Sequence, residues 1–196
     1  MYQYFIIYKP FNVLCQFEDI EGRQTLKSLY DFPKDVYSVG RLDMDSEGLL
    51  LLTNDKSLNN KLLNPSFQHQ REYWVQVEGI ITDEALLKLS KGVTINIDGK
   101  TYHTLPAKAQ KLPDNIKVRE RTPPIRFRKS VPDSWLSLKL VEGKNRQVRK
   151  MTASVGFPTL RLIRVAIEQL TLGEMKIGEV KELSKEVVYE KLRINR

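Results

Sequence analysis

The stretch Gly40-Arg41-Leu42-Asp43-Met44-Asp45-Ser46-Glu47-Gly48-Leu49-Leu50-Leu51-Leu52-Thr53-Asn54-Asp55 places an acidic turn between two apolar runs. Residues 36–39 before the turn and 49–53 after it have the short apolar pattern of strands. A carboxylate on a short loop between two strands is held in a fixed position, which is what a catalytic group needs. A merely solvated turn would not need glycine at both ends and Arg41 beside it. Asp43 is therefore the first candidate for a functional residue.

The rest of the chain alternates short strand patterns with a few helical ones. Helices are predicted at 25–30, 54–63, 82–90 and 143–155. Strands are predicted at 2–8, 13–17, 72–78, 93–97, 107–112, 116–119, 135–141, 161–167, 169–172 and 182–183. Strands outnumber helices and most are spaced like hairpins, which predicts an α+β fold with a largely antiparallel sheet. The 196 residues fit one domain, or two small ones that share a core.

The excess positive charge is concentrated in one part of the chain. The net charge is +8, but residues 116–164 alone hold 13 Lys and Arg against three Asp and Glu, and the remainder is slightly acidic. A localised basic surface favours a polyanion, most simply nucleic acid. The alternative is a solvated basic face that has no partner.

Cysteine and histidine content excludes several classes of site. The single cysteine, Cys15, cannot form an internal disulfide, has no histidine partner for nucleophilic catalysis and is expected to pack. Two distant histidines give no zinc pattern. The first residues lack the basic start of a signal peptide, and no run approaches the ~20 apolar residues of a spanning helix. We expect a cytoplasmic protein with no membrane partner and no metal.

The acidic turn has other interpretations. It matches the first, third, fifth, sixth and eighth positions of a calcium-binding EF-hand loop at Asp43, Asp45, Glu47, Gly48 and Leu50. The twelfth position, which must be Glu, is Asn54, and the predicted flanks are strands rather than helices. A purely structural turn is a second alternative. A glycoside hydrolase would use two of these carboxylates, but a neutral sugar would not explain the basic stretch.

Two further residues are candidates for chemistry. An arginine close to a carboxylate keeps it ionised, and an ionised aspartate can attack, or take a proton at, an electron-poor sugar carbon. Arg149 is our candidate partner on the helix predicted at 143–155, although spacing alone does not favour it over Arg146. These basic residues could instead be phosphate contacts or solvated. Tyr73 is either a core aromatic residue or a ring that stacks on an extruded base.

Four ordered stretches resemble one group of RNA pseudouridine synthases, which comprises the RsuA, RluB, RluE and RluF types. The family's first motif is similar to Tyr8-Lys9-Pro10-Phe11-Asn12-Val13-Leu14-Cys15-Gln16-Phe17, and its catalytic loop is similar to the stretch Gly40 to Asp55. Its tyrosine motif is similar to Glu72-Tyr73-Trp74-Val75-Gln76-Val77-Glu78-Gly79. Its late arginine motif is similar to Glu142-Gly143-Lys144-Asn145-Arg146-Gln147-Val148-Arg149-Lys150-Met151. Residues 123–132 and 156–164 look most like the RluE type. Asn12 stands where many relatives carry glycine.

This resemblance implies a fold, an activity and a site. It implies one catalytic domain over 1–196 without an N-terminal S4 module, its mostly antiparallel mixed sheet in two halves with flanking helices and an active-site cleft between them. It implies an enzyme that isomerises one uridine of large-subunit (23S) ribosomal RNA to pseudouridine without a cofactor. We expect this enzyme to be a monomer. Asp43 would be catalytic, Arg149 would hold it charged and Tyr73 would stack on the uracil. The implied RNA contacts are Arg41, Arg126, Arg128, Lys129, Lys144, Asn145, Arg146, Gln147, Lys150, Arg161 and Arg164.

A non-catalytic rRNA-binding or ribosome-assembly protein is the alternative function. The same basic surface would serve it. The acidic loop argues against it, because RNA repels a carboxylate.

Overall fold

A computed structural model describes residues 1–125 and 131–194. The chain forms two compact units, Met1–His69 with Arg164–Arg196 and Gln70–Ile163. We call the first the terminal unit and the second the central unit. Strand β9 (Thr159–Ile167) spans the boundary, so each unit contains one end of it. The predicted α+β class with a mostly antiparallel sheet is confirmed.

The strands of the terminal unit form the order β11-β1-β3-β9, and β1 is antiparallel to both of its neighbours. Short strands extend this set, β2 on β3 and β10 on β9. Every residue of β1 and β3 is buried, which explains why β3 has an unbroken apolar run instead of an alternating pattern. The bounds are β1 (Tyr4–Lys9), β2 (Tyr37–Ser38), β3 (Glu47–Thr53), β10 (Leu170–Thr171) and β11 (Val180–Leu183).

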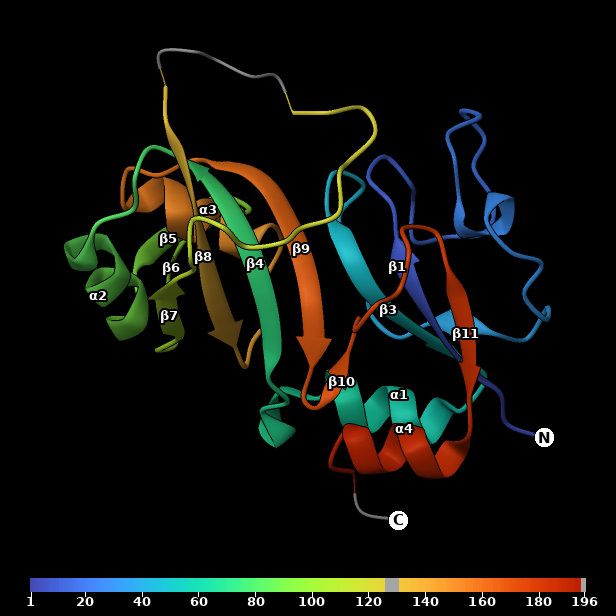
Figure 1. Cartoon of the computed structure of the whole chain (residues 1–196). Coiled ribbons are helices and arrows are strands. Elements are labelled where there is room, and N and C mark those ends of the chain that lie inside the picture. The colour runs from blue at the N-terminus through green and yellow to red at the C-terminus, as the bar shows by residue number, and fades with distance from the viewer. Residues whose placement is uncertain (126–130, 195–196) are drawn as a thin grey trace. The chain divides into compact units, whose positions relative to one another are not determined.

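Two helices of the terminal unit are joined through one buried carboxylate. Helix α1 (Lys56–Leu63) begins at Asp55, whose side chain accepts hydrogen bonds from the backbone N–H groups of Ser57 and Leu58. The Tyr4 hydroxyl on β1 and the Tyr189 hydroxyl on α4 (Lys185–Lys191) also donate to it, at 2.8 and 2.7 Å. Figure 1 shows α1 and α4 on the same side of β1 and β3.

These bonds set the ionisation of the group. Burial alone raises the pKa of Asp55, but the hydrogen bonds from Tyr189, Tyr4 and the two backbone N–H groups outweigh it and leave the pKa lowered. Burial and the bond to Asp55 raise the pKa of Tyr189 to about 12. The carboxylate is therefore stably charged in the folded protein.

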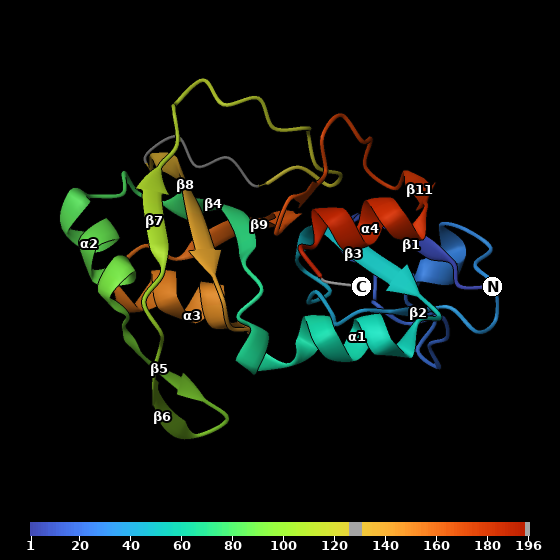
Figure 2. The same cartoon turned by 90° about the horizontal axis from the view of Figure 1, so that it is seen from below.

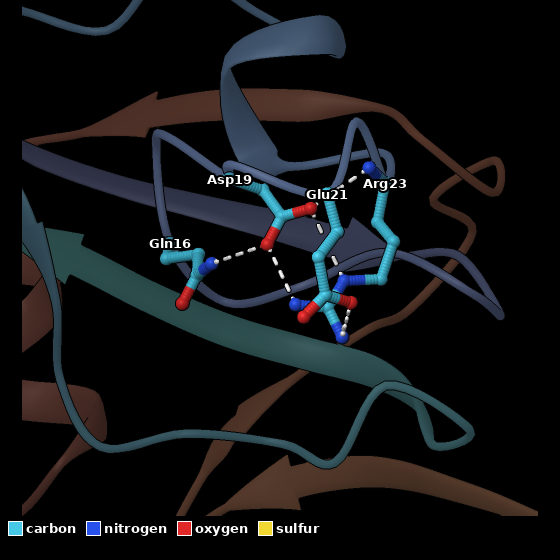
Figure 3. Close-up of polar contacts among 4 residues, drawn as sticks. All are labelled: Gln16, Asp19, Glu21 and Arg23. Carbon is cyan, nitrogen blue, oxygen red and sulfur yellow. Dashed lines mark hydrogen bonds and ion pairs between the residues drawn. The ribbon is translucent and has the colours of Figure 1, made fainter.

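The segment after β1 is a loop stabilised by side chains. The strand predicted at 13–17 is wrong, because Leu14 makes only an isolated bridge with Thr25 before a 3₁₀ helix at Leu26–Ser28. Figure 3 shows the polar contacts within this loop. Arg23 donates from Nε and Nη2 to the two oxygens of Asp19, at 3.1 and 2.7 Å, and these bonds lower the pKa of Asp19. The Arg23 Nη1 atom also lies 3.0 Å from Glu21 Oε2.

One hydrophobic cluster of the terminal unit gathers around β1 and β3. It consists of apolar side chains from β1, β3 and the segments before the acidic turn: Phe5, Ile7, Val13, Leu26, Phe32, Val36, Leu50 and Leu52. Cys15 packs against this cluster, as the sequence predicts. A second 3₁₀ helix, Pro65–Phe67, follows α1.

The strands of the central unit form the order β9-β4-β8-β7. Strand β8 (Asp133–Leu140) is antiparallel to both β4 (Arg71–Glu78) and β7 (Lys108–Lys111). Strands β5 (Thr94–Ile97) and β6 (Lys100–His103) form a separate hairpin, which extends away from β7 and β8 in Figure 2. Helices α2 (Asp83–Lys91) and α3 (Gln147–Ser154) lie beside β7 and β5 respectively.

Two further predictions of secondary structure need correction, and one helix was not predicted. Residues 116–119 form no strand. Helix α3 begins at Gln147 rather than at residue 143, because Arg146 has a left-handed backbone with φ of 53°. Helix α4 has no counterpart among the predicted helices.

Candidate active site

The loop that carries Asp43 is fixed from both of its sides in the terminal unit. Ser46 N donates to Asp43 O at 3.0 Å and closes a turn around the half-buried Asp43 side chain. Asn12 N, from the segment after β1, donates to Met44 O at 2.9 Å. Val39 N donates to Leu51 O at 2.8 Å and ties the start of the loop to β3. The predicted strand–turn–strand arrangement is confirmed. An EF-hand loop requires a helix on each side, so the strands argue against the calcium-binding interpretation.

A buried lysine lies under this loop and was not identified from the sequence. Lys9 is 0% exposed, and its Nζ donates to Pro10 O at 2.8 Å and to Met44 O at 3.3 Å. Burial lowers the pKa of Lys9 to about 8, although Cys15 and the carboxylates of the loop, Asp43 among them, act in the opposite direction. The ammonium group thus joins β1 to the backbone of the acidic turn. Its sequence signals were its place in the first motif and the Lys-Pro pair directly after the strand predicted at 2–8, and neither indicates a buried ammonium group.

Cys15 also contacts the loop, in a structural manner. Its Sγ accepts from Leu42 N and donates to Leu42 O, both at 3.3 Å. Burial raises the pKa of the thiol, so the reactive thiolate is disfavoured. This supports the expected packing role.

Two of the predicted RNA contacts, Arg161 and Arg164, are buried side chains of β9. Arg164 is 4% exposed and its Nε donates to Leu49 O at 2.8 Å, so it braces β3 next to the acidic loop. Gly48 on β3 is required here, since a Cβ would lie 2.3 Å from Arg164 O. The hydrogen bond to β3 explains why Arg164 is buried. Because both side chains are buried, we do not assign RNA contact to Arg161 or Arg164.

In the central unit, β4 presents Tyr73 on its buried side with Val75 and Val77, and Tyr73 is 9% exposed. Arg149 is a half-buried residue of α3, next to the buried side chains of Val148 and Met151 on the same helix. Both candidate interpretations of Tyr73 therefore stay open on geometry alone.

The basic turn before α3 separates into exposed and buried residues. Lys144, Asn145 and Arg146 are exposed, and Lys150 is half-buried. Gln147 is 4% exposed and makes internal hydrogen bonds, so we do not assign it to RNA contact. Arg41 in the terminal unit is exposed. Arg126, Arg128 and Lys129 lie outside the described residues.

Two kinds of feature are absent from the described residues. Within 1–125 and 131–194, no three His, Cys, Asp or Glu side chains gather closely enough to hold a metal ion. In the same ranges, no helix combines the length and apolar composition needed to cross a membrane.

The comparisons with known proteins assign the chain to a class. The family described as RNA pseudouridylate synthase matches residues 3–154, and the chain belongs to that family of isomerases. A solved structure titled "Crystal structure of pseudouridylate synthase" matches with a TM-score of 0.79 and 27% identity, covering 98% of this chain and 74% of that one. The resemblance drawn from the four motifs is confirmed.

Curated relatives narrow the similarity further. The chain is 49% identical over 178 residues to "Ribosomal large subunit pseudouridine synthase E" of Vibrio parahaemolyticus, which covers 91% of this chain and 72% of that protein. It is 49% identical over 164 residues to the protein of the same name from Xanthomonas axonopodis pv. citri, covering 83% and 84% respectively. The predicted similarity to the RluE type is also confirmed.

Proposed function

We propose that this chain converts a uridine of large-subunit ribosomal RNA to pseudouridine. The observation that carries the proposal is near-50% identity, over most of the chain, to proteins named for that activity. The rigid carboxylate loop in the terminal unit supports it, because a non-catalytic RNA binder has no need of a fixed carboxylate. The localised positive charge of residues 116–164 supports an RNA substrate.

In the proposed reaction, the uracil leaves its ribose carbon, turns, and rejoins the same carbon through C5. One C–N bond breaks and one C–C bond forms, and the proton on C5 is replaced by the sugar while N1 gains a proton. Because the product is an isomer of the substrate, no oxidant, reductant or second substrate is consumed. We assign the Asp43 carboxyl group to this step, acting at the ribose or at the base.

Two residues of the central unit complete the proposed site. We propose that Arg149 pairs with Asp43 and keeps it ionised, since a guanidinium within ~4–6 Å favours the charged carboxylate. We propose that Tyr73 stacks on the extruded uracil and assists removal of the C5 proton.

We assign phosphate binding to exposed and half-buried cationic or polar residues of both units: Arg41, Lys144, Asn145, Arg146 and Lys150. We further propose that the protein acts as a cytoplasmic monomer. Sedimentation of the purified chain with and without an rRNA fragment tests the oligomeric state.

Tritium release separates this function from passive RNA binding. Formation of pseudouridine expels the hydrogen on C5, so the wild-type protein should release tritium from large-subunit rRNA that contains 5-tritiated uridine. Small-subunit rRNA prepared in the same way is the control and should release none. Tight binding to large-subunit rRNA without release of tritium would instead favour the assembly protein.

A further inference from the structure

The Glu142 carboxylate of the central unit is buried among neutral hydrogen-bond donors. The residue is 8% exposed. Its Oε2 accepts from the Tyr102 hydroxyl at 2.5 Å, and its Oε1 accepts from Leu105 N at 2.8 Å and Gln147 Nε2 at 2.6 Å. A buried carboxylate is costly unless several donors satisfy it. The donors come from β6, the segment after it and α3, so the group connects three parts of the unit.

Gln147 extends this connection to the start of α3. Its side-chain amide donates to Glu142 and accepts from Lys144 N at 2.9 Å, and its backbone N donates to Lys144 O at 3.1 Å. Helix α3 begins at Gln147, and the preceding residue, Arg146, makes no side-chain capping bond. The Glu142–Gln147 bond therefore ties the first residue of α3 to the segment before the helix through a side chain.

The β5–β6 hairpin supports the same turn from outside. Lys144 Nζ lies 5.1 Å from the centre of the Tyr102 ring, a cation–π contact. Asn145 Nδ2 donates to Asp98 Oδ1 in the hairpin turn at 3.3 Å. Tyr102 thus contacts Glu142 with its hydroxyl and Lys144 with its ring. The hairpin lies outside the β9-β4-β8-β7 order, and these contacts give it a defined role in the unit.

We propose that Glu142, with Tyr102, is a positioning residue that holds α3 and thereby Arg149 in the orientation needed for turnover. Arg149 lies two residues after Gln147 in the first turn of α3. Loss of the Glu142 carboxylate releases Gln147, loosens the helix end and lets the Arg149 guanidinium move. The role of Arg149 in turnover rests on the proposed function, whereas the fixing of α3 does not.

Kinetics of matched variants test the proposal. Glu142→Ala should lower kcat by about 10- to 100-fold, because small displacements of a positioned group are costly, while Kd for an rRNA fragment changes by less than about threefold. Glu142→Gln should keep kcat within about threefold. Its amide oxygen can accept from Leu105 and Gln147, and its amide nitrogen can donate to the Tyr102 hydroxyl oxygen. Rescue by the amide shows that bond geometry, not charge, is required.

Thr82→Ala is the control for general destabilisation. Thr82 caps α2 through Ala85 N at 3.2 Å, so its loss should lower the melting temperature without lowering kcat. The double variant Glu142→Ala with Gln147→Ala should lose no more kcat than Glu142→Ala, since both act through one bond. Equal kcat in Glu142→Ala and Thr82→Ala, or equal losses in Glu142→Ala and Glu142→Gln, would overturn the proposal.

Amide hydrogen exchange gives a readout that does not need activity. Exchange of the α3 amides should be faster in Glu142→Ala and unchanged in Glu142→Gln and Thr82→Ala. Wild-type protein that releases no tritium contradicts the proposed function, whereas unchanged α3 exchange in Glu142→Ala contradicts the positioning role. If Glu142→Ala does not fold, Tyr102→Phe decides. Tyr102→Phe removes the hydroxyl that donates to Glu142 but keeps the ring. It should lower kcat less than Glu142→Ala is expected to, and the α3 amides should exchange faster than in the wild type. Wild-type values of both kcat and α3 exchange in Tyr102→Phe would refute the proposal.

Discussion

Gly48 is the position at which the acidic loop depends most directly on close backbone packing. Gly48 has φ of +112°, and a Cβ built there would lie 2.3 Å from Arg164 O and 2.6 Å from Arg164 N. These are backbone atoms of the neighbouring strand, so no side-chain rotation can relieve the contact. Gly48→Ala must therefore separate β3 from β9 and displace the loop that carries Asp43.

The cost has two parts that can be estimated. A side chain at such a φ costs about 1–3 kcal/mol. Forcing a methyl group into a packed backbone contact costs about 1–3 kcal/mol more. We expect Gly48→Ala to lower the free energy of unfolding by about 2–6 kcal/mol, which for a chain of this length corresponds to roughly 10 °C in Tm.

Urea and thermal unfolding of Gly48→Ala and Gly22→Ala measure this effect. Gly22 belongs to the same unit and has φ of +72°, but a Cβ there would have no atom within 4 Å. Its substitution should therefore cost only the backbone strain, about 1–2 kcal/mol. Equal destabilisation by the two substitutions would refute the close approach of β3 and β9 at Gly48.

Three further predictions concern the charged groups. Asp55→Asn should lower the free energy of unfolding at pH 7 by about 2–3 kcal/mol in urea titrations, because charge-assisted hydrogen bonds become neutral ones. The pKa of Asp55 is lowered in the folded protein, so the stabilisation by its carboxylate is complete above the ordinary carboxyl pKa of about 4 and is lost as the pH falls through the folded pKa. The difference in unfolding free energy between wild type and Asp55→Asn should therefore shrink in acid and not at alkaline pH. Arg149→Leu should nearly abolish tritium release while rRNA binding persists, and a variant that only binds more weakly with a smaller salt slope would make Arg149 a phosphate contact. Arg146→Ala should weaken binding and reduce the salt slope by about 1, with turnover at saturating RNA retained, as measured by filter binding over a range of salt concentrations.

Local patterns predicted the elements that depend on local causes. The leucine run gave β3, and the alternation after Arg71 gave β4. The helices predicted at 54–63 and 82–90 match α1 and α2, which begin directly after the capping residues Asp55 and Thr82, within two residues. Each signal reflects burial periodicity or a bond to the next turn of the same helix.

Elements that depend on distant contacts were missed. Helix α4 contains β-branched residues and only a Ser184 cap as a local signal, and it is joined to α1 by a hydrogen bond between Tyr189 and Asp55. The start of α3 depends on the bond between Gln147 and Glu142 and on the left-handed Arg146, neither of which periodicity reveals.

The candidate site shows the same division. The motifs identified Asp43, Tyr73 and Arg149 as candidates, but no pattern in one sequence distinguishes a buried cation from an exposed one. Lys9 and Arg164 are both buried beside the acidic loop. The sequence indicated the end of a strand at Lys9, and it indicated an RNA contact at Arg164.

Tritium release by the Asp43→Asn variant tests the central claim most directly. The substitution keeps the size of the side chain and removes the charge, so the variant should fold, bind large-subunit rRNA within a few-fold of wild type, and release no tritium from 5-tritiated uridine. Release within a few-fold of the wild-type rate would contradict the catalytic role of the Asp43 carboxylate.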